Sequence, residues 1–228
     1  MNRTLNVVRM QLVNRQTFVW IPLIILGGAF VLMLAVIFMV PGDEPKIGGA
    51  AQAPLWYFLV VGIYALALSF PFSQAMGVTR REFHLGTLAT AALTSIILAV
   101  LFTLGGLVEE ATNGYGRNGF FFRIPWLTDG PWFVTLLIYF SAALLFFTIG
   151  YTAAAIYKRW GTLWLTVALV VLALGVVGLG WILIATGTWT STFDWVGAQG
   201  PQGVGFGMLG ATVVLSAASY GVLRRTTP

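Results

Sequence analysis

Residues 18–40 of the chain, FVWIPLIILGGAFVLMLAVIFMV, form one continuous apolar run without a charged side chain. A helix needs about 20 apolar residues to cross the hydrocarbon core of a bilayer, so this run is long enough to span one. It is also longer than the roughly 7–15 residues of a signal-peptide core. We therefore expect a retained membrane-spanning helix.

Five further runs have the same apolar character. Only 8% of the 228 residues are charged, against roughly 25% in soluble domains, and a soluble fold would leave large apolar patches exposed. The runs do not alternate apolar and polar residues with a period of two, which argues against a β-barrel. The sequence therefore predicts an all-α, polytopic membrane protein with six transmembrane helices, over residues 18–40, 55–72, 85–108, 132–157, 162–186 and 204–223.

Basic residues are distributed unequally between the connecting segments. Nine of the twelve lie on the side that holds both chain ends and the turns near residues 80 and 158, whereas only Lys46, Arg117 and Arg123 lie on the other side. The positive-inside rule therefore predicts that both termini are cytoplasmic in a multi-pass plasma-membrane protein. Because this placement accounts for the net charge of +5, we expect the lipid bilayer, and no nucleic acid, as a partner.

Residues 1–17 precede the transmembrane domain at 18–228 and predict a separate cytoplasmic helix. Leu5, Val8 and Leu12 share one helical face, and Gln11 belongs to the opposite, polar side. This pattern favours a helix that lies in the membrane interface. The alternative is a short solvated tail whose arginines only set the topology.

The sequence offers little catalytic chemistry. All charged residues lie outside the six predicted cores, whereas ion-coupled pumps need ionisable groups at membrane depth. The chain has one histidine and no cysteine, and no Gly-x-x-x-x-Gly-Lys-Ser/Thr loop. We therefore expect no enzyme, no catalytic residue, no metal site and no cofactor in this chain.

The turn after the second predicted span contains the most informative motif. Gly77 can end a helix in the left-handed conformation, and Thr79 with Glu82 has capping-box spacing, which predicts a new helix from Thr79. Arg80, Arg81 and Phe83 would then sit on a rigid backbone that is suited to docking on a partner. The alternative is a capped helix start whose arginines serve topology alone.

This stretch, Gly-Val-Thr-Arg-Arg-Glu-Phe, resembles the permease subunits of ABC-type exporters of the ABC-2, or type V, class. The resemblance implies a coupling helix that docks on a separate cytoplasmic ATP-binding subunit, which would hold ATP and Mg²⁺. It also implies a second permease copy or a paralogue as partner. Carried over by position, the coupling helix would comprise Gly77, Thr79, Arg80, Arg81, Glu82, Phe83 and His84.

The resemblance thus implies a half-transporter that moves an unidentified substrate outward. The alternative is a non-transport immunity or scaffold protein that binds a partner through its loops. Outside the membrane, residues 109–131 contain many aromatic side chains, among them Phe121, Phe122 and Trp126. We expect them to form a headgroup belt. The alternative is that they line an exit for an amphipathic substrate. Residues 187–203 predict a short, glycine-rich loop before the last span.

Overall fold

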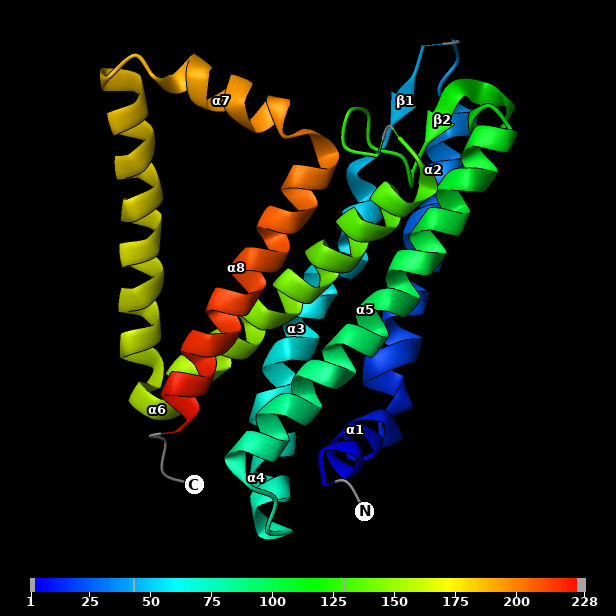
Figure 1. Ribbon diagram of the computed structural model, residues 1–228. Helices are drawn as coiled ribbons and strands as arrows, with labels where there is room; N and C mark the ends of the chain where they lie inside the picture. Colours follow the sequence, from blue (N-terminus) through cyan, green and yellow to red (C-terminus); the bar gives the residue numbers. More distant parts are fainter. Residues whose placement is uncertain (1–2, 43, 129, 225–228) are drawn as a thin grey trace.

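The computed structural model describes residues 3–42, 44–128 and 130–224. It is built almost entirely of helices (Figure 1), which confirms the all-α class. In chain order the α-helices are α1 (Arg3–Val13), α2 (Ile21–Met39), α3 (Ala53–Ala67), α4 (Ser69–Ala75), α5 (Arg80–Ala111), α6 (Trp132–Ala185), α7 (Trp189–Ala198) and α8 (Gly200–Leu223). Two short strands, β1 (Lys46–Ile47) and β2 (Gly119–Phe120), pair in parallel.

The described residues contain helices that are long and apolar enough to cross a membrane. There are five, namely Gln16–Met39, Ala53–Ala75, Arg80–Ala111, Trp132–Ala185 and Gly200–Leu223. The fourth has 54 residues, which would extend about 81 Å if straight and exceed the roughly 30 Å core of a bilayer. Gly161, with a φ of +83°, breaks this helix, and Figure 1 shows the chain reversing direction there.

Prolines modify two of the predicted spans. The expected helix over 55–72 is divided at Leu68 between α3 and α4, because Pro71 has no N–H to donate to the carbonyl of Ala67. The first span begins with a π-helical turn, Gln16–Trp20, and Pro22 lies just inside α2. Pro22 thus follows directly on the π-helical turn, in which the Ile21 N–H donates to the carbonyl of Gln16, and the span continues through it as membrane helices allow.

The first half of α6 lies at the centre of the packing, in contact with α3, α5 and α8. Its approach to α3 depends on two glycines. A Cβ atom on Gly62 would lie 2.0 Å from the carbonyl oxygen of Phe147, and one on Gly150 would lie 1.9 Å from that of Leu59. The backbones of the two helices are therefore in direct contact, as small residues permit in membrane proteins.

Helix α1 packs against α5 through a face that the sequence did not predict. Val7 and Gln11 are both buried, and the Gln11 Nε2 donates to Thr87 Oγ1 over 2.9 Å. Leu5, which was expected on the buried apolar face, is 55% exposed. The assignment of Gln11 to the polar outer side was therefore wrong, because its hydroxyl partner lies 76 residues away in the sequence.

The segment after Gly161 extends away from the remaining helices. None of the residues 162–198 is buried, and the predicted loop over 187–203 contains the helix α7 instead. Figure 1 shows the second half of α6 standing apart from α8, with α7 bridging their upper ends. The expectation of a loop was therefore wrong for residues 189–198, which form regular helix despite the glycines on either side.

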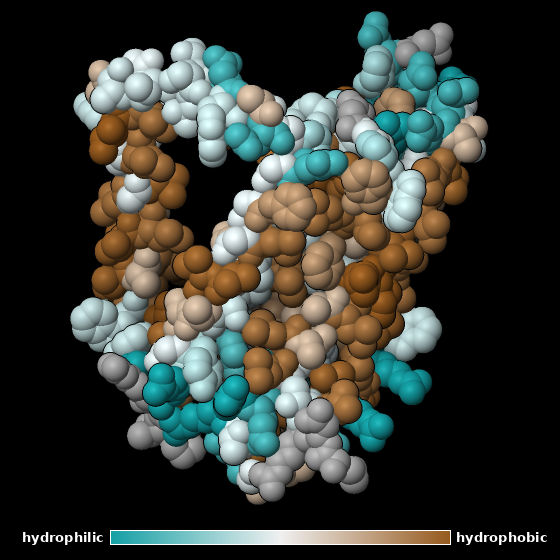
Figure 2. Space-filling model, in the orientation of Figure 1, coloured by the Kyte–Doolittle hydropathy of each residue, from teal (hydrophilic) through white to brown (hydrophobic). Residues whose placement is uncertain are grey.

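Polar side chains gather at the two ends of the molecule, and an apolar band separates them (Figure 2). The lower end in Figure 1 holds α1, the α4–α5 turn, the break at Gly161 and the end of α8. The upper end holds the two strands and α7. The segments that the charge pattern assigned to opposite sides of a membrane therefore lie at opposite ends of the fold.

We expect Gly150→Ala to lower the midpoint of thermal unfolding in detergent. The added methyl would meet the carbonyl of Leu59, and overpacking of this kind typically costs about 1–3 kcal/mol. The matched control is Gly178→Ala in the second half of α6, where nothing lies within 4 Å of a new Cβ. Equal midpoints for the two variants would contradict the close contact between α3 and α6.

Candidate functional site

The α4–α5 turn at the lower end of the molecule has the local geometry that the sequence predicts. Gly77 has a φ of +71°, and its N–H donates to the carbonyl of Gln74 over 3.0 Å. The next N–H, of Val78, donates to the backbone carbonyl of Ser73 over 3.1 Å. Gly77 therefore ends α4 in the left-handed conformation, as expected.

The capping box at the start of α5 is confirmed. The Thr79 Oγ1 accepts a hydrogen bond from the Glu82 backbone N–H over 3.3 Å. The Glu82 Oε2 accepts from the Thr79 N–H over 2.9 Å and from its hydroxyl over 2.8 Å. These bonds satisfy amides that the helix leaves free. The turn therefore holds one defined backbone shape.

Two of the predicted docking side chains point into the protein. Phe83 is completely buried, with its ring 5.2 Å from that of Phe70, and His84 is also buried. In this conformation Phe83, which was predicted as part of the docking helix, has no exposed surface to offer a partner. Met76, just before Gly77, is an exposed apolar side chain at 53%, and Arg81 in the first turn of α5 is also exposed.

Polar contacts connect the turn to α6 and α8. The Arg80 Nη1 donates to the carbonyl of Arg224 over 2.7 Å, at the end of α8. His84 lies between two hydroxyls, with Nδ1 3.2 Å from the Tyr151 oxygen and Nε2 3.2 Å from Ser216 Oγ. The first turn of α5 is therefore bonded to both neighbouring helices. Arg80 and His84 thus make contacts within the helix bundle.

A buried carboxylate organises the opposite end of the molecule, and the sequence analysis did not identify it. Glu109 is fully buried at the end of α5. Its oxygens accept hydrogen bonds from the backbone N–H groups of Phe121, Phe122 and Arg123, over 2.6 to 3.0 Å. Bonds of this kind offset the cost of burying a carboxylate.

Tyr115 completes this carboxylate site. Its hydroxyl donates to Glu109 Oε1 over 3.2 Å. Burial, followed by the charge of Glu109 and this hydrogen bond, raises the pKa of Tyr115 above its usual value. The phenol therefore stays protonated and remains a donor at neutral pH.

The aromatic residues of this loop do not all form a belt. Phe121 and Phe122 are buried, and both rings lie 5.5 Å from the ring of Phe30 in α2. Trp126, by contrast, is 64% exposed. The prediction of a headgroup belt was therefore wrong for the two phenylalanines, because Glu109 draws their backbone inward.

Between these two ends, α5, the first half of α6 and α8 enclose two cavities. The cavity next to the α4–α5 turn has a volume of about 490 Å³, and the one nearer the upper end has about 390 Å³. Both are lined mainly by apolar side chains. No group of three or more histidine, cysteine, aspartate or glutamate side chains suited to a metal occurs in the described part of the chain.

Comparison with protein-family models, with characterised proteins and with solved structures gave no match. The functional assignment therefore depends on the geometry of the chain itself and on the resemblance of the turn motif.

We expect Glu109→Gln to loosen the loop between α5 and α6. The amide group would turn an NH₂ toward backbone N–H donors, and an unsatisfied buried donor typically costs about 1–3 kcal/mol. Limited proteolysis should therefore cleave residues 112–131 faster in the variant. The control is Glu110→Gln, since that side chain is 64% exposed and forms an ion pair with Arg123 over 3.5 Å. Equal cleavage of both variants would contradict the anchoring role of Glu109.

Proposed function

We propose that the chain is the transmembrane half of an ATP-driven exporter whose ATPase is a separate subunit. The observation that carries the proposal is the rigid α4–α5 turn, which projects at the charged end of the molecule (Figure 1). Arg80 and His84 bond the start of α5 to α8 and α6, so a force on the turn would reach the membrane helices. ATP and Mg²⁺ would be held by the partner, since this sequence has no phosphate-binding loop.

The proposed topology has six crossings with the charged lower end in the cytoplasm of a plasma-membrane protein. The two halves of α6 would cross separately and reverse at Gly161. Helix α1 would lie in the cytoplasmic interface, with the exposed Leu5 toward lipid and Val7 toward α5. A second copy, or a paralogue, would complete the translocation pathway.

The docking surface that we propose differs from the one expected from sequence. Met76 would be its apolar anchor and Arg81 its charged contact, because both side chains are exposed. Methionine and arginine are enriched at protein interfaces. Thr79 and Glu82 would hold the backbone, and Phe83 would fix the turn to the core through Phe70.

Cysteine accessibility tests the six crossings, because the chain has no native cysteine. In intact cells, a membrane-impermeant maleimide should label Pro45→Cys and Gly197→Cys and should leave Lys158→Cys unlabelled until the cells are lysed. Position 197 has open space around a new side chain. Labelling of positions 158 and 197 from the same side would show that the second half of α6 does not cross.

A photocrosslinking amino acid in place of Met76 tests the docking surface. In cells of the source organism, it should form a covalent adduct with a cytoplasmic ATP-binding subunit. The reason is the 53% exposure of Met76 at the tip of the turn. The matched control is position 171, since Val171 is 62% exposed on the second half of α6 and would face lipid.

The adduct at position 76 should be identified by mass spectrometry. Recovery of an ATPase from position 76, and not from position 171, supports the half-transporter. An adduct that contains only a protein without a nucleotide-binding site would overturn it and favour the scaffold or immunity function.

A further inference from the structure

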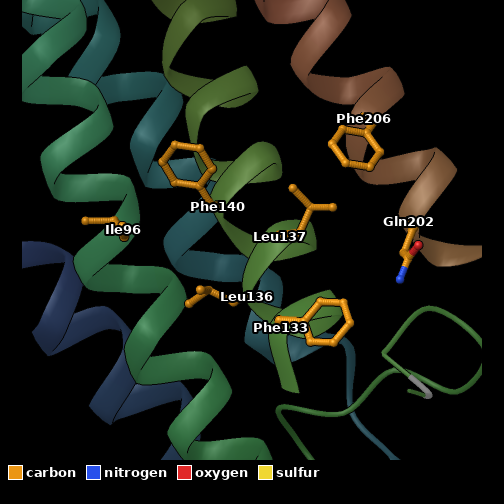
Figure 3. Close-up of a pocket in the computed structure, with 7 residues that line it drawn as sticks. All are labelled: Ile96, Phe133, Leu136, Leu137, Phe140, Gln202 and Phe206. Atoms are coloured by element: carbon orange, nitrogen blue, oxygen red, sulfur yellow. The ribbon is translucent and has the colours of Figure 1, made fainter. Parts of the chain in front are cut away.

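The two cavities lie one after the other along the first half of α6, between α5 and α8. The lower cavity ends at Ala92 of α5 and Leu144 of α6, and the upper one begins one helical turn further on, at Ile96 and Phe140. Figure 3 shows Phe206 of α8 across open space from the α6 side chains of the upper cavity. We call the lower cavity the α5–α8 groove.

The α5–α8 groove carries charge at one end only. Its body is lined by apolar residues such as Leu85, Leu88, Ala92 and Val213. Arg81 lies at its lower end and is the one charged residue of its lining. No hydrogen bond or ion pair holds Arg81 to the other described residues. A ligand of this groove would therefore meet a positive charge at one end and hydrocarbon along its length.

The other polar groups at this end are already engaged. His84 lies 3.2 Å from both Tyr151 and Ser216, so these side chains satisfy one another. Arg224 lies over the ring of Tyr220, at 5.9 Å, and adds a second cation next to the mouth. The described acidic side chain nearest in sequence, Glu82, is bound to Thr79 by the capping box. The mouth therefore carries an excess of positive charge.

The length of the groove fits one leaflet of a bilayer. From Arg81 to Ala92, α5 rises by about 16 Å at 1.5 Å per residue. This is about half of the roughly 30 Å hydrocarbon thickness of a membrane. An acyl chain of one leaflet can therefore extend along the groove while its polar head remains level with Arg81.

We infer that the α5–α8 groove binds an anionic amphiphile, with its head against Arg81 and an acyl chain against Leu85, Leu88 and Val213. The head would be a phosphate or a carboxylate, supplied by a phospholipid of the cytoplasmic leaflet or by a free fatty acid. Arginine suits both anions because its guanidinium presents paired N–H donors. The inference goes beyond the proposed exporter and concerns binding alone.

Photoaffinity labelling of the purified full-length chain in phosphatidylcholine vesicles tests the inference. The probes are diazirine forms of palmitic acid, phosphatidylglycerol and phosphatidylcholine, with the diazirine in the acyl chain, and labelled peptides are mapped by mass spectrometry. At least one anionic probe should label residues 85–92 and 213–217 more strongly than the phosphatidylcholine probe. Arg81→Gln should reduce this labelling about tenfold, which corresponds to about 1.4 kcal/mol.

Two pairs of variants separate binding from general effects. Arg159→Gln removes a basic residue outside the groove lining, one that lies over Trp160 at 4.3 Å, and should leave labelling unchanged. Ala92→Phe should fill the groove and block labelling, whereas Ala89→Phe, at an exposed position of the same helix outside the lining, should not. Thermal unfolding of every variant verifies that the chain is folded.

The pattern of probes then decides the outcome. Labelling by phosphatidylglycerol identifies a membrane lipid as the ligand, and labelling by palmitic acid alone identifies a free amphiphile. Equal labelling by all three probes that Arg81→Gln does not reduce would mean annular lipid only and would overturn the inference. Photocrosslinking at Met76 leaves Arg81 unchanged, so the docking of an ATPase and the binding of an amphiphile are tested separately although both proposals use this arginine.

Discussion

The direct contact of backbone with backbone at Gly62 and Gly150 sets the distance between α3 and α6. Within a membrane, apolar surfaces gain little from meeting one another, and close packing becomes a main source of association. The two glycines allow that packing because carbonyl oxygens occupy the space where side chains would stand. With one face of α6 fixed to α3, the opposite face remains for α5 and α8, which diverge and leave the groove between them.

Both ends of α5 are held by hydrogen bonds to backbone groups outside the regular helix. At the lower end the capping box of Thr79 and Glu82 starts the helix, and at the upper end Glu109 gathers the amides of residues 121–123. A helix of 32 residues is therefore anchored at both of its ends. The charged groups of α5 stay at its two ends, away from the middle of the apolar band, where an ion would be costly.

Local signals in the sequence predicted local structure. Gly77 determines the end of one helix, and the Thr79–Glu82 pair determines the start of the next, each through contacts within a few residues. The apolar runs predicted helices because a bilayer leaves no other partner for their backbone groups. Contacts between distant residues could not be predicted in this way. The burial of Glu109 was not predicted because its amide partners follow 12 to 14 residues later, and Gln11 was assigned to the polar side of its helix because Thr87 lies on another helix. The same limit explains Phe83, whose burial depends on Phe70 across the turn.

Four consecutive residues at the start of α5 meet four different surroundings, because successive side chains on a helix are turned by about 100°. Arg80 binds the end of α8, Arg81 lies at the mouth of the groove, Glu82 closes the capping box, and Phe83 enters the core. The capping box makes this turn a single rigid piece. In the proposed exporter, a partner that displaced Met76 would therefore move Arg80 and Arg81 together. The hydrogen bond from Arg80 to the end of α8 and the position of the Arg81 charge at the groove would then change together. A coupling element needs such a physical link.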